Sequence, residues 1–153
     1  MSDPTLKERL GAEITAALRS GEKVRLGALR MLSAAITNRE KEIRHELSDE
    51  EVRDVAAKET KKRGESIEAF EGAGRLELAE KEREEREAIA GYAPEPMSGP
   101  ELDALVEEAI AATGATSEKE FGAVMGYLMG KARGRADGKI AQEKVRARLR
   151  GPS

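Results

Sequence analysis

The sequence lacks cysteine and tryptophan, and its aromatic residues are limited to two tyrosines and two phenylalanines among 153 residues. Without cysteine the chain has no disulfide bond, thiolate metal site or thiol nucleophile, and a reducing compartment is favoured. The scarcity of aromatic rings argues against a protein that stacks single-stranded bases. No stretch approaches the roughly 20 apolar residues of a membrane span, and the opening MSDPTLKERL has no signal-peptide core. We therefore expect a cytoplasmic protein without membrane association.

What the chain does have is helical periodicity and helix-capping patterns. Leu6, Leu10, Ile14 and Leu18 recur every four residues behind a capping box that begins at Thr5. Charged residues make up 37% of the chain, so the hydrophobic core is expected to be thin. These patterns predict an all-α protein.

Residues 91–100, GYAPEPMSGP, contain three prolines and two glycines and are not expected to be helical throughout. We interpret them as a linker. Residues 1–90 then form an N-terminal domain that resembles a four-helix bundle, and residues 101–153 form a small C-terminal domain of three helices.

Charge is distributed unevenly along the chain. Residues 131–150 hold eight Lys and Arg against two acids, whereas the first 130 residues hold 19 bases against 28 acids. Flexible cations beside the amide groups of a helix N-terminus form a general phosphate site, so this segment is the candidate ligand-binding region. An Arg135–Asp137 ion pair within the turn is the structural alternative. The candidate phosphate-binding side chains are Lys131, Arg133, Arg135, Lys139, Lys144, Arg146 and Arg148.

Four glycines belong to the same candidate region. Gly122 and Gly126 lie four residues apart on one helix face, which suggests the close approach of either a neighbouring helix or a ligand phosphate. Gly134 and Gly138 bracket the turn, and either can adopt a positive φ. A secondary basic face is expected from Arg25, Arg30, Arg39, Lys41, Lys61, Lys62 and Arg63.

The segment GAVMGYLMGKARGRADGKIAQEKVRARL resembles the C-terminal signature of the GatB/YqeY family. Upstream, RLGALRMLSAAITNREKE and LSDEEVRDVAAKETKKRGESIEAFEGAGRLELAEKE resemble the N-terminal domain of stand-alone YqeY-like proteins. The sequence departs from the family pattern at Gly130, where proline is usual, in the linker YAPEPMS, and at Ala141, where an N-cap serine is usual. The last departure predicts a weakly capped final helix.

The resemblance implies a helical module related to the tail of the B subunit of the glutamine-dependent aspartyl/glutamyl-tRNA amidotransferase, a tail that contacts tRNA. The family is also associated with carbon–nitrogen ligase activity that uses glutamine as amido-N-donor. We expect no autonomous activity here, because the chain lacks an amidase-like Ser/Lys loop and a phosphate-binding loop. The single Glu-x-x-His motif, Glu42 to His45, has no second copy, so neither a metal nor another cofactor is expected.

Two functions therefore stay open. The first is a non-catalytic tRNA-binding accessory module. The second is an adaptor that docks on an aminoacyl-tRNA synthetase or an amidotransferase subunit. A salt-dependent affinity for naked tRNA separates them, because only the first function requires it.

Overall fold

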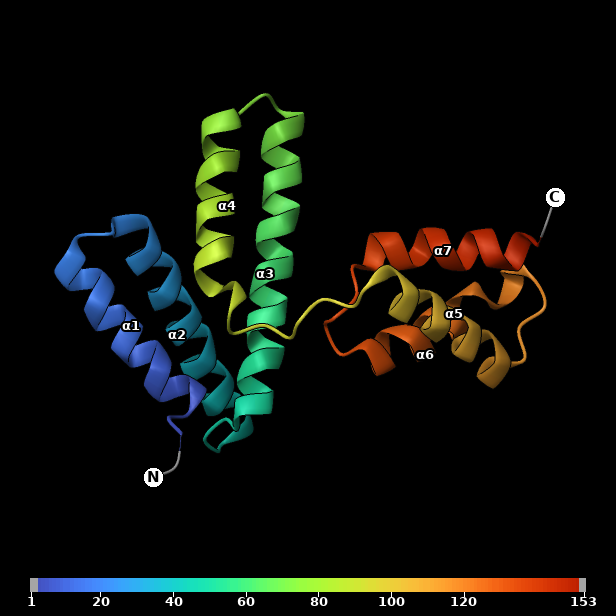
Figure 1. The fold of residues 1–153 in the computed structure, drawn as a ribbon, viewed down its shortest axis with the longest axis horizontal. Coiled ribbons are helices and arrows are strands. Elements are labelled where there is room, and N and C mark those ends of the chain that lie inside the picture. Colours follow the sequence, from blue (N-terminus) through green and yellow to red (C-terminus); the bar gives the residue numbers. More distant parts are fainter. Residues whose placement is uncertain (1–2, 152–153) are drawn as a thin grey trace. The chain divides into compact units, whose positions relative to one another are not determined.

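The predicted all-α class is confirmed by the computed structural model of the chain, which describes residues 3–151 (Figure 1). These residues form seven α-helices and one 3-10 turn, without a β-strand. The chain divides into two compact units, Met1–Pro94 and Glu95–Ser153. Residues 1, 2, 152 and 153, at the outer ends of the two expected domains, lie outside the described residues.

Four helices build the N-terminal unit, and local sequence sets their ends. Thr5 and Ser48 each form a reciprocal capping box with the glutamate three residues later, and Gly21 ends the first helix with a φ of 76°. The helices are α1 (Leu6–Ser20), α2 (Lys23–Ile43), α3 (Asp49–Gly72) and α4 (Leu76–Ala90).

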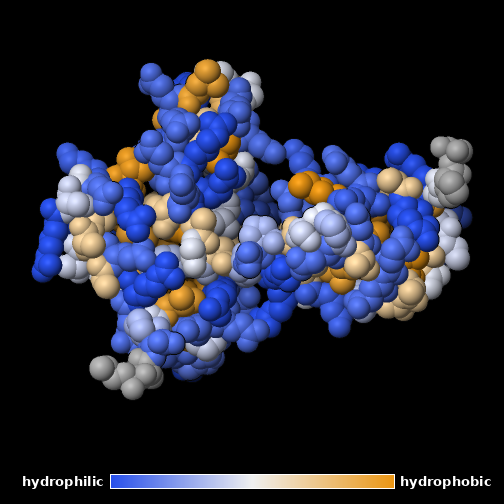
Figure 2. All heavy atoms as spheres, viewed as in Figure 1, coloured by the Kyte–Doolittle hydropathy of each residue, from blue (hydrophilic) through white to orange (hydrophobic). Residues whose placement is uncertain are grey.

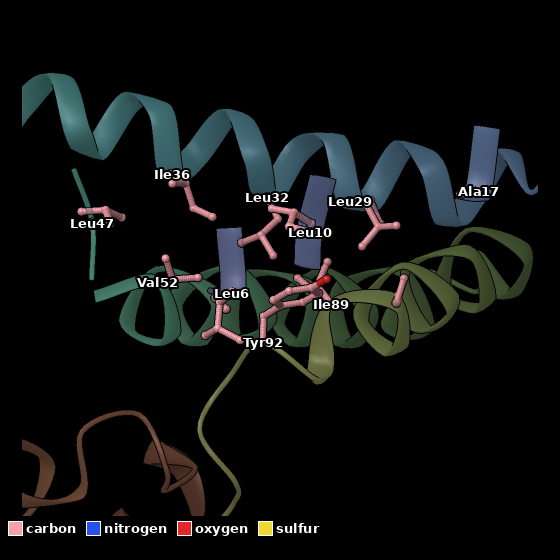
Figure 3. Close-up of a cluster of buried hydrophobic side chains, with 13 residues drawn as sticks. Leu6, Leu10, Ala17, Leu29, Leu32, Ile36, Leu47, Val52, Ile89 and Tyr92 are labelled. Atoms are coloured by element: carbon pink, nitrogen blue, oxygen red, sulfur yellow. The ribbon is translucent and has the colours of Figure 1, made fainter. Parts of the chain in front are cut away.

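The core of this unit lies where α1, α2, the start of α3 and the end of α4 meet (Figure 3). Tyr92, just after α4, is 1% exposed in this cluster, and the Arg9 guanidinium lies 5.1 Å from its ring centre. Leu18, which the four-residue spacing placed inward, is 57% exposed. A spacing of four exceeds the helical repeat of 3.6 and drifts around the helix, so Ala17 is the buried residue of the last turn.

A buried ion pair joins α3 to α4. Arg63 and Glu85 are only 5% and 8% exposed, and the Arg63 Nη1 donates to the Glu85 carboxylate and, at 3.3 Å, to Glu82. Arg63 therefore does not belong to a basic surface, and that prediction is wrong. The physical reason is that α4 offers few apolar anchors to α3, and Arg63 is enclosed there by the carboxylates that neutralise it.

Three helices build the C-terminal unit: α5 (Gly99–Thr113), α6 (Phe121–Ala132), which follows a 3-10 turn at Glu118–Glu120, and α7 (Gly138–Arg150). Ser98 caps α5 through a capping box, and Gly114 ends it with a φ of 68°. The three helices share one core, which consists of Leu102, Val106, Ala109, Ala115, Val124, Leu128, Ala141 and Val145. Within residues 3–151, no helix has the length and apolar character needed to cross a membrane.

Candidate nucleic-acid interface

The turn between α6 and α7 begins with two consecutive residues that have positive φ. Arg133 has a φ of 45° and Gly134 a φ of 79°, whereas Gly138 is the first residue of α7 and does not adopt positive φ. Asp137 is the N-cap of α7 and accepts hydrogen bonds from the amides of Lys139, at 2.8 Å, and Ile140, at 3.2 Å. The expected phosphate position at this helix N-terminus is therefore taken by the Asp137 carboxylate.

The same cap corrects the prediction about Ala141. Ala141 is fully buried in the core of the unit and is not the N-cap residue. Because Asp137 supplies a strong cap one turn earlier, α7 is not weakly capped.

Arg135 holds the turn against the segment that leads into α5. Its Nε donates to the Glu95 carbonyl at 2.7 Å, and its Nη2 donates to the Glu101 carboxylate at 3.0 Å. The Met97 amide donates to the Arg135 carbonyl at 2.8 Å. The Arg135–Asp137 ion pair considered from the sequence does not form, because the two side chains have these other partners.

Acidic residues of α5 and the 3-10 turn form ion pairs with three of the five Lys and Arg residues of α7. Lys144 contacts Asp103 at 2.6 Å, Arg148 contacts Glu107 at 2.5 Å, and Arg150 contacts Glu118 at 2.7 Å. The Glu107 carboxylate raises the pKa of Arg148. The pKa of Glu101 is lowered, mainly by the Ser98 amide and then by Arg135.

These ion pairs join the cations of residues 131–150 to acids of the same compact unit, so the unit as a whole is not cationic. Residues 95–130 carry seven acids and one base, so residues 95–153 hold nine of each sign and have no net charge. Residues 1–130 hold nine more acids than bases, and residues 95–130 account for six of these nine. Most of the acidic excess thus lies in the same compact unit as residues 131–150. The uneven charge along the sequence therefore does not set residues 131–150 apart as a cationic end in the fold.

Two other cations stack on aromatic rings instead of pairing with carboxylates. The Lys131 Nζ lies 5.8 Å from the centre of the Tyr127 ring, and the Arg146 guanidinium lies 4.6 Å from that of Phe121. Both cations are exposed, and a ring orients a cation without neutralising its charge. Arg133 and Lys139 are also exposed and have other interactions.

The glycine face of α6 is open. Gly122 and Gly126 are exposed, and a Cβ added at either position would meet no atom within 4 Å. The same holds for Gly130, one turn further along. The interpretation that a neighbouring helix needs these glycines is therefore wrong for the part of the chain that the structure describes.

The secondary basic residues of the N-terminal unit do not share one surface. Rotation by 100° per residue places Arg30 and Lys41 about 140–180° around α2 from Arg25 and Arg39. Arg25 pairs with Glu13 at 2.8 Å and Arg39 with Glu42 at 3.0 Å. On α3, Lys61 is exposed and Lys62 lies 3.6 Å from Glu59. Three of these six cations are paired, and the six do not form one continuous basic face.

His45, the only histidine, has its Nδ1 2.9 Å from the Glu46 carbonyl oxygen and its Nε2 3.7 Å from Glu51. Among residues 3–151 no group of three or more His, Asp or Glu side chains is placed to hold a metal ion.

Sequence reasoning missed the acidic residues that pair with the candidate cations. A signal was present, because Asp103 and Glu107 have the same four-residue spacing as Lys144 and Arg148. Such a match predicts ion pairs only if the two helices are known to pack in parallel, and that arrangement comes from the fold.

Together, the fold and this surface define a small helical protein with an open glycine face on α6 and exposed, ring-stacked cations on α6 and α7. The family model described as Yqey-like protein matches residues 7–149, and the chain belongs to this family. The chain is also similar to "Altered inheritance of mitochondria protein 41, mitochondrial" from Pyrenophora tritici-repentis, with 33% identity over 140 residues, which cover 90% of this chain and 77% of the relative. Because that relative is named as mitochondrial, the cytoplasmic location of this protein stays a prediction.

Proposed function

We propose that this YqeY-like protein is a non-catalytic accessory module that binds the phosphate backbone of structured RNA, with tRNA as its ligand. The setting we propose is aminoacyl-tRNA metabolism linked to the glutamine-dependent tRNA amidotransferase. The observation that carries the proposal is the open face of α6 at Gly122 and Gly126, on a unit whose α6 and α7 also carry exposed cations, among them Arg146.

Glycine inside a helix costs up to about 1 kcal/mol relative to alanine. At Gly122 and Gly126 no neighbouring protein atom would exclude a side chain, because an added Cβ would meet nothing within 4 Å. A ligand that approaches the helix backbone is a physical reason for both glycines. Phe121, on the same helix, holds the Arg146 guanidinium over its ring, about 100–140° around α6 from the two glycines.

The surface suits a phosphate backbone better than exposed bases. Only two tyrosines and two phenylalanines occur in the chain, and Tyr92 is buried in the N-terminal unit. Much of the surface on the face drawn in Figure 2 is hydrophilic. Recognition by shape and charge is typical of double-stranded RNA, where 2′-hydroxyl groups and phosphates are exposed and base edges are less accessible.

A bulky side chain on the open face tests this proposal. Gly126→Leu is expected to leave the fold intact and to stabilise α6 slightly, since leucine is the better helix former. The same substitution is expected to weaken the binding of bulk tRNA, measured by fluorescence anisotropy, because the leucine occupies the space of the ligand.

Gly11→Leu is the matched control. Gly11 lies in the interior of α1, is exposed, and also has no atom within 4 Å of an added Cβ. It is expected to have the same effect on helix stability and no effect on tRNA affinity. Equal tRNA affinities for Gly126→Leu and the wild-type protein would contradict the proposed surface.

One observation favours a second function, an adaptor that docks on an aminoacyl-tRNA synthetase or amidotransferase subunit. The C-terminal unit has no net charge, and this weakens its long-range attraction for a polyanion. The adaptor requires no affinity for naked tRNA. A wild-type protein that fails to bind tRNA at low salt, but binds such a protein subunit, would establish the adaptor instead.

A further inference from the structure

The acidic residues of α5 are placed where they compete with an external phosphate backbone for the cations of α7. Asp103 and Glu107 lie one helical turn apart on α5, and their partners Lys144 and Arg148 lie one turn apart on α7. The two ion pairs therefore form successive contacts, about 6 Å apart along the helices. Glu101, bound to Arg135 at 3.0 Å, precedes them along α5.

These pairs lie at the surface and contribute little to the fold. The side chains of Arg148 and Glu107 are 50% and 56% exposed, and the Asp103 side chain is 64% exposed. Exposed ion pairs of this kind are screened by water and salt and open easily. A phosphate group can therefore replace either carboxylate without unfolding the unit.

We propose that Glu101, Asp103 and Glu107 are specificity-determining residues, which hold Arg135, Lys144 and Arg148 in ion pairs until a dense array of phosphates displaces them. This inference rests on the proposed RNA binding. Each carboxylate lowers the affinity for every polyanion, and the loss is recovered only by a ligand that supplies a phosphate to the released cation. A structured RNA, with its high density of backbone charge, is such a ligand, whereas an isolated phosphate or a sparse acidic peptide is not.

The test measures tRNA affinity for four proteins: wild type, Glu107→Gln, Arg148→Ala and the double variant. If Glu107 competes with phosphate, Glu107→Gln binds tRNA several-fold more tightly, because Arg148 no longer has to be released. Arg148→Ala binds more weakly. In the Arg148→Ala background, Glu107→Gln has little further effect, and this loss of additivity is the signature of competition for one cation.

Glu143→Gln is the control for a general effect of charge. It removes the same charge from α7 itself, but no ion pair to a cation is seen for Glu143 in the described structure. Glu143→Gln is expected to change tRNA affinity less than Glu107→Gln does. Thermal melting of each variant, expected to stay close to that of wild type, excludes a folding defect as the cause.

A ligand comparison tests the specificity directly. Glu107→Gln is expected to gain affinity for tRNA by a factor at least as large as for polyglutamate, a less strongly charged polyanion, because a ligand that leaves the Glu107–Arg148 pair closed gains nothing from its removal.

The outcomes separate the two proposals. An equal gain from Glu107→Gln in the presence and absence of Arg148, or an equal gain from Glu143→Gln, would overturn the competition and leave RNA binding standing. The absence of saturable tRNA binding in all four proteins would overturn the proposed function, and the competition with it.

Discussion

Replacement of Arg63 by methionine is expected to destabilise the N-terminal unit strongly and to leave tRNA binding unchanged. Arg63 is 5% exposed and neutralises Glu85, which is 8% exposed, and Glu82. Removal of one partner of a buried ion pair costs about 3–5 kcal/mol, because the other charge stays buried without compensation. Lys81, 3.7 Å from Glu85, offers partial compensation and favours the lower end of that range.

This loss is large for a small unit. A domain of this size has a free energy of unfolding of roughly 5–15 kcal/mol. A loss of 1 kcal/mol lowers the Tm of a domain of 60–100 residues by about 4–8 °C, so Arg63→Met is expected to lower it by more than about 12 °C. Circular dichroism melting of the intact chain measures the shift of the N-terminal transition.

A double variant distinguishes the effect of the uncompensated Glu85 charge from the effect of lost packing around Arg63. Arg63→Met together with Glu85→Met removes both charges and is expected to regain much of the lost stability, since apolar side chains often replace a buried pair without cost. Affinity for tRNA, measured well below the melting temperature, is expected to equal that of wild type in both variants. If Arg63→Met shifts the Tm by less than about 2 °C and weakens tRNA binding, Arg63 is a surface cation and our reasoning is refuted.

Three further predictions concern capping, pH and catalysis. Asp137→Ala is expected to destabilise the C-terminal unit by about 1 kcal/mol through loss of the α7 cap, whereas Asp137→Ser retains most of the stability in the same melting experiment. The pKa values of Glu51 and Glu101 are lowered, mainly by backbone amides of their capping boxes. Their contribution to stability is complete above the unfolded pKa of about 4.3 and is lost as the pH falls through the lowered folded values, so acid titration by circular dichroism is expected to show destabilisation below about pH 4. The purified protein is expected to release no ammonia from glutamine and to consume no ATP; turnover that a substitution in this chain abolishes would contradict this.

Local sequence was sufficient to predict the helices. The capping boxes at Thr5, Ser48 and Ser98 and the glycines at the helix ends act over a few residues, so their effect is visible without the fold. Core positions were less predictable at helix ends. Leu18 follows the apolar spacing but is exposed, because the fold, and not the spacing alone, determines where a helix loses its neighbours.

The candidate site was harder to predict because its chemistry depends on pairs that are distant in the sequence. Arg135 and Arg148 look like free cations in the sequence, yet their partners, Glu101 and Glu107, lie 34 and 41 residues away. The buried position of Arg63 depends in the same way on the packing of α3 against α4. The spacing of Gly122 and Gly126 is visible in the sequence, but only the structure shows that no helix covers them.

The most direct test of RNA binding is the salt dependence of tRNA affinity for the wild-type protein, measured between about 50 and 200 mM monovalent salt. If tRNA phosphates contact the exposed cations of α6, the turn and α7, we expect saturable binding, with a slope of log K against log salt of about −2 to −4. A slope near zero, or no saturable binding at the lowest salt, would contradict the account.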